Sequence, residues 1–112
     1  RYMSALQYQR YIPGTNILEK EAFRSLVTAY LNASEKQLTE CTLIEVELGE
    51  VSLEEAGKRL GAQMRQSDFL GELQDGRVYA LLANTRPKDA AVVLQRFRDS
   101  GFNCRITEEV SL

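Results

Sequence analysis

The stretch that decides the fold is residues 65–82, RQSDFLGELQDGRVYALL. Two short apolar runs within it, residues 69–73 and 78–82, lie on either side of the dipeptide Asp75-Gly76. Asp-Gly between two such runs is the strongest short-range signal of a β-hairpin, because its residues accept the positive φ angles of a tight turn. The stretch therefore predicts a β-hairpin at the centre of the fold.

The residues around the hairpin predict helices and strands on both sides of it. Apolar residues at helical spacing indicate helices, and continuous apolar runs indicate further strands. In chain order these elements are a helix over residues 17–32, a strand over 41–48, a helix from 53 to about 65–67, the hairpin, a helix over 87–100 and a strand over 102–106. This order predicts an α+β fold in which helices cover one face of a mainly antiparallel sheet.

Capping residues set the predicted helix ends. Asn16 and Glu19 have the spacing of a capping box, with Asn in place of Ser, and Ser52 and Glu55 repeat the pattern. In such a box the first side chain accepts a hydrogen bond from the first turn of the helix. Gly101 is expected just after the last helix, because glycine accepts the left-handed conformation found there.

Length and composition indicate one globular domain. The chain has 112 residues, of which 44% are hydrophobic, and this is enough for a core of its own. Its formal net charge is −2, so binding to a nucleic-acid polymer, which needs a basic stripe, is not expected. No stretch reaches the roughly 20 apolar residues of a membrane span, and we expect no signal peptide. We expect a cytoplasmic domain that meets a membrane only through segments outside this sequence.

The chain begins at Arg1 rather than at Met, and we expect it to be a piece of a longer protein. Residues 1–12 are rich in aromatic side chains. They form either the end of a linker helix from an upstream domain or a packed N-terminal arm. Residues 13–112 are assigned to the domain itself.

Histidine and cysteine usage narrows the chemistry. The sequence contains no histidine, which excludes Ser-His and Cys-His nucleophile pairs and imidazole metal sites. Cys41 and Cys104 both fall in apolar, strand-like runs. We therefore expect buried, reduced thiols rather than a disulfide.

Several segments follow a known pattern in the same order. They are Thr15-Asn16-Ile17 with the helix after it, the strand over 42–48, the helix LEEAGKRLGAQMRQSD over 53–68, the strand over 78–82 and the helix over 88–98. Together they resemble a GGDEF domain, the fold of the diguanylate cyclases, over most of the chain. Arg65-x-x-Asp68 matches the family's RxxD inhibitory site at its usual distance from the hairpin. The resemblance implies a shortened GGDEF-like fold and a role in cyclic di-GMP signalling.

Two departures from the family's pattern argue against catalysis. The signature turn Gly-Gly-Asp/Glu-Glu-Phe is replaced by QDGRV at residues 74–78, which removes the glycine pair and the catalytic acid pair, because Gly76 or Arg77 takes the place of the metal-binding Glu. Residues 48–52 are all that remains of a longer segment that contacts the substrate in the family. Condensation of two nucleoside triphosphates needs divalent metal held by clustered carboxylates. We therefore expect that the domain is not an enzyme and holds neither metal nor cofactor.

Glu45 and Glu47 lie on the predicted strand, where the family places its first-strand acid. They would stand opposite a turn that offers Arg77 rather than a second acid. Since Glu side chains are usually exposed, we interpret both as exposed strand carboxylates rather than metal ligands.

Arg65 and Asp68 are the residues that we expect to bind a ligand. The resemblance implies that the ligand is cyclic di-GMP, with Arg96 on the last helix as a further arginine of the site. Arg65 offers a planar donor fork to the O6/N7 edge of guanine or to a phosphate, and Asp68 can accept from guanine N1–H and N2–H₂. As exposed positions at a helix end, both are expected to tolerate substitution. The weaker candidates are Arg77, Arg86 and Arg98.

Two functional classes remain for a domain that has lost its active site. In the first, it is a receptor that passes the cyclic di-GMP signal to a protein partner or an upstream sensory domain, as the receptor of the Pel exopolysaccharide system does in biofilm regulation. In the second, it is an interaction or dimerisation module in which the RxxD pair is a relic. The first class is the one that we expect.

Overall fold

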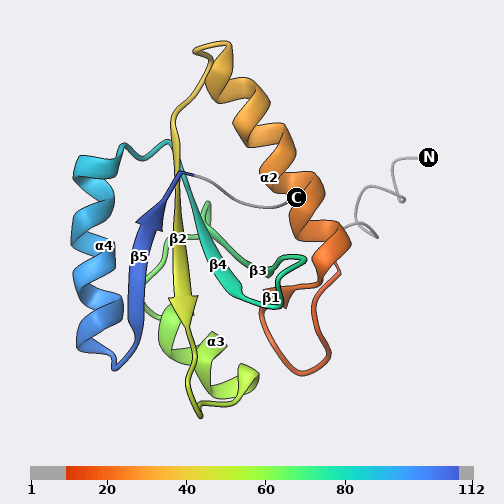
Figure 1. The fold of residues 1–112 in the computed structure, drawn as a ribbon, viewed down its shortest axis with the longest axis vertical. Coiled ribbons are helices and arrows are strands. Elements are labelled where there is room, and N and C mark those ends of the chain that lie inside the picture. The colour runs from red at the N-terminus through yellow and green to blue at the C-terminus, as the bar shows by residue number, and fades with distance from the viewer. Residues whose placement is uncertain (1–9, 109–112) are drawn as a thin grey trace.

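The structure is a computed structural model that describes residues 10–108, and it is built on one mixed sheet (Figure 1). Within these residues the strand order is β1-β3-β4-β2-β5, in which β1 is parallel to β3 and the other neighbours are antiparallel. The elements are β1 (Ile17–Leu18), α2 (Lys20–Glu35), β2 (Cys41–Glu47), α3 (Leu53–Gly61), β3 (Phe69–Glu72), β4 (Val78–Ala83), α4 (Pro87–Asp99) and β5 (Asn103–Thr107). The predicted α+β fold with a mainly antiparallel sheet is confirmed, and β1 is an element that the sequence did not predict.

The β3–β4 hairpin forms where the Asp-Gly dipeptide predicted it. Gly76 has a φ of +76°, which glycine adopts without strain, and its N–H donates to the Leu73 carbonyl oxygen at 2.9 Å. The Asp75 carboxylate accepts from the Arg77 N–H at 2.9 Å and from the Tyr79 hydroxyl at 2.7 Å. Because all these contacts are local, the local sequence was enough to predict the turn.

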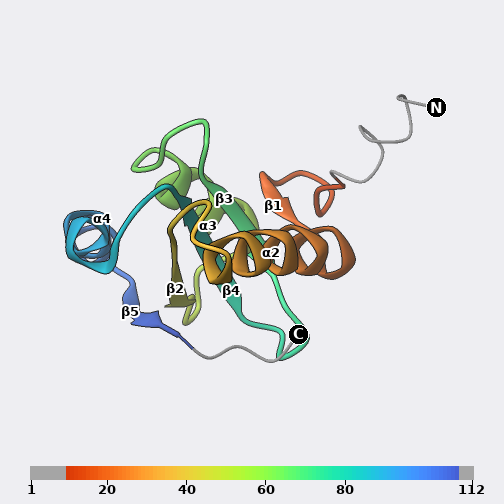
Figure 2. The same ribbon diagram turned by 90° about the horizontal axis from the view of Figure 1, so that it is seen from above.

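Helices cover both faces of the sheet, and the prediction of a single covered face is wrong. Figure 2 shows α2 on one face and α3 and α4 on the other. All six residues of β4 are buried, so side chains on either face need an apolar cover. The cluster under α2 consists of Leu18, Phe23, Val27, Leu43, Leu73, Tyr79 and Leu81. The cluster under α3 and α4 includes Ile44, Leu60, Leu82 and Phe97.

The start of α2 differs from the predicted capping box. The helix begins after β1, and Glu19 precedes it without a side-chain cap bond. Asn16 instead donates from its Nδ2 to the Gly57 carbonyl oxygen at 3.0 Å, which ties the N-terminal segment to α3. A Cβ at Gly57 would lie only 2.1 Å from the Asn16 Oδ1, so the glycine is needed for this approach. The long-range bond explains why Asn16 does not cap a helix.

The other helix ends are confirmed in part. Ser52 caps α3 by accepting from the Glu55 N–H at 3.2 Å, and Gly101, with a φ of +100°, follows the end of α4. However, α3 ends at Gly61, earlier than predicted, and residues 62–68 run to β3 through successive turns. The RxxD pair therefore lies on a loop rather than at a helix end. No helix in the described part of the chain has the length and apolar character to cross a bilayer.

Residues 10–12 run beside the edge of the sheet. Tyr11 forms an isolated β-bridge with Leu18 of β1, and the Arg10 carbonyl oxygen accepts from the backbone of the residue before α2. This part of the predicted linker or arm is thus packed on the domain. The remainder, residues 1–9, lies outside the described residues.

Both cysteines are free thiols, as predicted. Cys104 is buried, and its Sγ lies 3.6 Å from the Leu94 carbonyl oxygen. Cys41 is only half-buried because it begins β2 at the end of the sheet, so the prediction of a buried thiol is wrong for this residue. Burial raises the pKa of both thiols above the usual value, although Arg98 opposes the rise at Cys104.

Candidate functional site

Arg65 and Asp68 are joined side chain to side chain on the loop between α3 and β3. Arg65 Nε lies 3.2 Å from Asp68 Oδ2, and Arg65 Nη2 lies 3.1 Å from Asp68 Oδ1, which makes a two-pronged charged pair. Arg65 Nη2 also donates to the Ala83 carbonyl oxygen at 2.8 Å and to Thr85 Oγ1 at 2.7 Å. The pair thereby fastens the loop to the end of β4. Its hydrogen bonds and charge raise the pKa of the Arg65 guanidinium above the usual value.

The two side chains differ in exposure. The Asp68 side chain is 1% exposed, and its carboxylate accepts from Arg65 N, Nε and Nη2 and from the Ala83 N–H. A carboxylate has about four lone-pair sites, so the acceptor capacity of Asp68 is filled. The Arg65 side chain is 59% exposed, and its Nη1 makes no hydrogen bond within the described residues. The prediction that both positions are exposed is therefore wrong for Asp68, which the contact with β4 buries.

A solvent-open groove of about 160 Å³ lies beside this pair. The residues that line it include Tyr11, Asn16, Met64, Arg65, Asp68 and Leu70. Some of them give the groove apolar surface, and others bring polar groups to it. Small-molecule sites commonly combine apolar walls with a few polar groups that fix the orientation of the ligand. The groove is therefore the candidate ligand site of the domain.

Arg96 stands apart from the Arg65–Asp68 pair. Thr85, which contacts Arg65, lies just before α4, whereas Arg96 lies in the last turn of that helix. The nine residues from Pro87 to Arg96 correspond to about 13 Å along a helix axis. No hydrogen bond or ion pair joins the Arg96 side chain to another group in the part of the chain that the structure describes.

The weaker arginine candidates have partners elsewhere in the domain. These partners are Glu45 for Arg77, Asp89 for Arg86 and the Cys104 carbonyl oxygen for Arg98. None of these contacts involves the RxxD pair. Of the predicted arginines, the structure therefore brings only Arg65 to the groove among the described residues.

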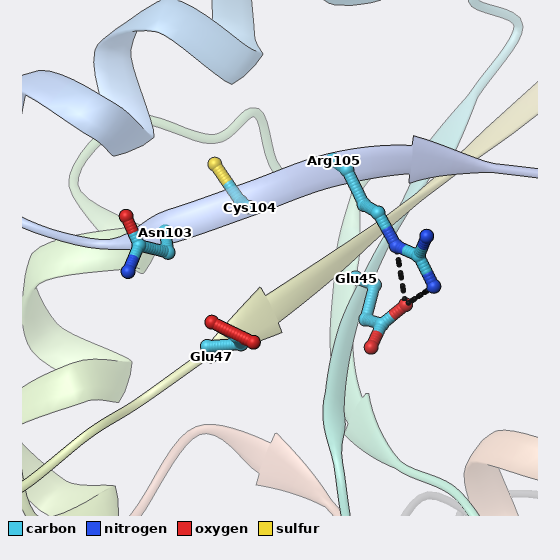
Figure 3. Close-up of a pocket in the computed structure, with 5 residues that line it drawn as sticks. All are labelled: Glu45, Glu47, Asn103, Cys104 and Arg105. Atoms are coloured by element: carbon cyan, nitrogen blue, oxygen red, sulfur yellow. Dashed lines mark hydrogen bonds and ion pairs between the residues drawn. The ribbon is translucent and has the colours of Figure 1, made fainter.

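A second charged cluster surrounds Glu45 of β2, on the sheet face that α2 covers. Its side chain is 5% exposed, so its interpretation as an exposed carboxylate is wrong. Glu45 Oε1 lies 3.0 Å from Arg105 Nε of β5 (Figure 3), and Oε2 forms an ion pair with Arg77 Nη1. Glu45 is buried because β2 is a central strand with a neighbour on each side. Glu47 is exposed, as predicted, and Figure 3 shows that it lies apart from Arg105.

The Glu45 cluster does not fit a divalent metal ion. Magnesium and similar hard cations need several oxygen ligands at one point. Both carboxylate oxygens of Glu45 are bound by guanidinium groups, and within residues 10–108 no group of three or more Asp, Glu, His or Cys side chains is placed to hold a metal. The guanidinium groups of two arginines neutralise this buried carboxylate.

Tyr79 and Asp75 extend the cluster toward the hairpin turn. Burial raises the pKa of the Tyr79 hydroxyl well above its usual value, and the hydrogen bond to Asp75 raises it further. Burial by itself raises the pKa of Asp75, but the hydrogen bonds from Tyr79 and from the Arg77 N–H, with the charge of Arg77, lower it more. Tyr79 thus stays a neutral donor and Asp75 a charged acceptor near neutral pH.

Two residues of the groove region were not predicted to act there. Thr85 was expected only as a possible cap of the last helix, with Arg86 as the alternative, yet its hydroxyl contacts Arg65 and donates to the Ala83 carbonyl oxygen at 2.8 Å. Tyr11 was placed in a linker or arm, yet it lines the groove. Both contacts join segments that are far apart in the sequence, so no local pattern announced them.

Comparison with solved structures shows which proteins share this fold. The crystal structure of the diguanylate cyclase SiaD from Pseudomonas aeruginosa, in complex with its activator SiaC, matches 94% of this chain with a TM-score of 0.73 and 18% sequence identity. The fold is that of a GGDEF domain. The GGDEF domain of FimX from the same bacterium matches 77% of the chain, with a TM-score of 0.66 and 21% identity. A DGC protein from Thermotoga maritima matches 86%, with a TM-score of 0.61 and 23% identity.

The GGDEF fold is shared here at low sequence identity. No family model matches the sequence, and no curated protein matches it significantly. The chain spans 51% of the SiaD chain, 62% of the FimX chain and 82% of the Thermotoga chain. A shared fold does not fix an activity, which has to be argued from the residues of the site.

Proposed function

We propose that this chain is a catalytically inactive GGDEF-like domain that binds cyclic di-GMP at Arg65 and Asp68 and passes the signal to a protein partner. The observation that carries the proposal is the exposed guanidinium of Arg65, which Asp68 and Thr85 hold beside an open groove. The GGDEF fold, shared with a diguanylate cyclase, supports a cyclic dinucleotide as the ligand.

Arg65 supplies the charged contact in this proposal. Its Nη1 faces no partner within the described residues, and its side chain is largely exposed. A guanidinium can donate in parallel to the O6 and N7 atoms of guanine, or to two oxygens of a phosphate. Cyclic di-GMP offers both kinds of acceptor in one molecule.

Asp68 has two roles in this proposal. In the free domain it holds Arg65, and all of its acceptor sites are in use. To accept from guanine N1–H and N2–H₂, it releases the Nε and Nη2 groups of Arg65, which turn toward the ligand. The exchange replaces two internal hydrogen bonds by bonds to guanine. Arg96 stays a predicted further contact, to be measured with the Arg96→Ala variant.

The second part of the proposal, the lack of catalysis, is supported by the Glu45 cluster. Phosphoryl transfer from nucleoside triphosphates depends on metal to neutralise the phosphates. Here the strand carboxylate is paired with Arg77 of the hairpin and with Arg105. A turn that brings the positive charge of Arg77 to this carboxylate competes with a metal ion instead of helping to bind it.

An interaction module without a ligand is the second candidate function. The burial of Asp68 favours it, because the Arg65–Asp68 pair already works as a clamp between the loop and β4. SiaD, a structural neighbour, is known in complex with a protein activator. On this reading the partner would bind the domain directly, and cyclic di-GMP would play no part.

Titration calorimetry with two ligands separates the candidates. Cyclic di-GMP and cyclic di-AMP share the phosphates but differ in the base edge that Arg65 and Asp68 would read. The receptor proposal predicts saturable binding of cyclic di-GMP and much weaker binding of cyclic di-AMP. Equal binding of both ligands would mean that only phosphate is recognised. Absence of any binding at tens of micromolar, for this chain and for the full-length protein, would leave the interaction module.

A further inference from the structure

A half-exposed aromatic ring lines the same groove as Arg65. Tyr11 is 48% exposed, which is unusual for a large hydrophobic side chain of this domain. The other large hydrophobic side chains with high exposure in the described part of the chain are Leu38 and Val92, which do not line this groove. Nothing in the contacts of the described residues uses the Tyr11 hydroxyl, so the ring is not held there by a polar partner.

The backbone around Tyr11 is fixed in place. Tyr11 forms a β-bridge with Leu18, and on its N-terminal side the Arg10 carbonyl oxygen accepts from the Glu19 N–H at 2.9 Å. The side chains of Arg10 and Glu19 also form an ion pair of 3.1 Å. The ring of Tyr11 therefore lies on an anchored segment, and little backbone conformational entropy is lost when it contacts a ligand.

We infer that Tyr11 is a stacking residue for the nucleobase of the ligand that enters this groove. The inference rests on the proposed function and adds a residue to its site. A purine base has a flat π-face and a polar edge. In binding sites an aromatic ring commonly stacks on the face, and a guanidinium commonly donates hydrogen bonds to the edge. Tyr11 and Arg65 line one groove and supply these two groups.

The size of the effect follows from measured stacking in other proteins. Stacking of a base on an aromatic side chain changes affinity by about 5- to 150-fold when the ring is removed. We expect a loss in this range for Tyr11→Leu, which keeps an apolar side chain but has no π-face. Tyr11→Phe keeps the face and loses only a hydroxyl that makes no hydrogen bond within the described range 10–108, so it should bind within about 2-fold of wild type.

The test is a titration of wild type, Tyr11→Leu and Tyr11→Phe with cyclic di-GMP, followed by calorimetry and by tyrosine fluorescence. The chain has no tryptophan and five tyrosines, so tyrosine emission is visible. If the base stacks on Tyr11, the ligand should quench the tyrosine emission of the wild type. This quenching should disappear in Tyr11→Phe, although this variant still binds. The ligand also absorbs the exciting light, which lowers the tyrosine emission without any stacking. Tyr11→Phe is measured at the same ligand absorbance and therefore serves as the control for this loss of emission. Thermal unfolding of each variant shows whether the fold is intact.

The outcomes separate this inference from the proposed function. Loss of affinity in Tyr11→Leu with retention in Tyr11→Phe supports the stacking role. If wild type and a folded Tyr11→Leu bind cyclic di-GMP equally, the stacking role is wrong and the receptor function stands. If wild type does not bind the ligand, the receptor function itself fails, and the role of Tyr11 fails with it.

Discussion

Arg77 of the hairpin forms an ion pair with Glu45 of β2, a carboxylate that is 5% exposed and is also bound by Arg105. This ion pair joins the hairpin turn to a central strand of the sheet. The turn of this chain therefore brings a positive charge to the strand acid, and the charged cluster acts as a structural element of the fold.

The first prediction concerns the stability of this cluster. Arg77→Ala or Arg105→Ala alone should lower the free energy of unfolding only slightly, since the other guanidinium still compensates Glu45. The double variant leaves a buried carboxylate unpaired and should lose about 3–5 kcal/mol, which is more than the sum of the two single losses. Urea unfolding of the wild type and the three variants forms a double-mutant cycle. Strictly additive losses would contradict a shared cluster.

The second prediction is the absence of diguanylate cyclase activity. The chain should form no cyclic di-GMP from GTP with Mg²⁺ or Mn²⁺, because Glu45 is neutralised by arginines and because Gly76 or Arg77 takes the place of the metal-binding acid in the turn. Chromatography of the reaction mixture measures the product, with heat-denatured protein as the control. Product that depends on the folded protein would overturn the proposed inactivity.

The third prediction concerns stability at high pH. The pKa of Tyr79 is raised in the folded state above the value of about 10 that an unfolded tyrosine has. The contribution of its neutral hydroxyl to the free energy of unfolding is therefore complete below pH ~10 and is lost as the pH rises through the folded-state pKa. Wild type should lose more stability above pH ~10 than Tyr79→Phe. Urea unfolding over a pH series tests this, with Tyr30→Phe as control, and parallel curves for wild type and Tyr79→Phe would refute it.

The fourth prediction follows from the burial of Asp68. Asp68→Ala leaves the Ala83 N–H, the Arg65 N–H and the Arg65 Nε without their acceptor. We expect a loss of about 1–3 kcal/mol in the free energy of unfolding, which replaces the expectation that this position is freely replaceable. Asp99→Ala, on the exposed end of α4, is the matched control and should stay within about 0.5 kcal/mol of wild type. Equal stability of the two variants would show that the Arg65–Asp68 clamp contributes nothing.

The elements that depend on local sequence were predictable. The hairpin needs only Asp75 and Gly76, and the start of α3 needs only the Ser52 hydroxyl. The start of α2 was not predictable in this way, because Asn16 has a partner 41 residues away. Helices cover both faces of the sheet because all of β4 is buried. A run of apolar residues in the sequence does not show whether one face of a strand is buried or both.

The candidate site was predictable in part. The RxxD spacing predicted that Arg65 and Asp68 act together, and the structure places them in contact. The burial of Asp68 and the contribution of Tyr11 depend on how the loop and the N-terminal segment pack on the sheet. The burial of Glu45 depends in the same way on Arg105, a residue 60 positions later in the chain.

The central claim is that Arg65 binds cyclic di-GMP, and calorimetry of wild type, Arg65→Ala and Arg59→Ala tests it most directly. Arg59 is a matched control because it is a partly exposed arginine of α3 that pairs with Glu55 and does not line the groove. Loss of charge-assisted contacts worth about 1.5–3 kcal/mol predicts roughly ten- to hundred-fold weaker binding in Arg65→Ala and no change in Arg59→Ala. Wild type that does not bind, or folded Arg65→Ala that binds as tightly as wild type, would contradict the claim.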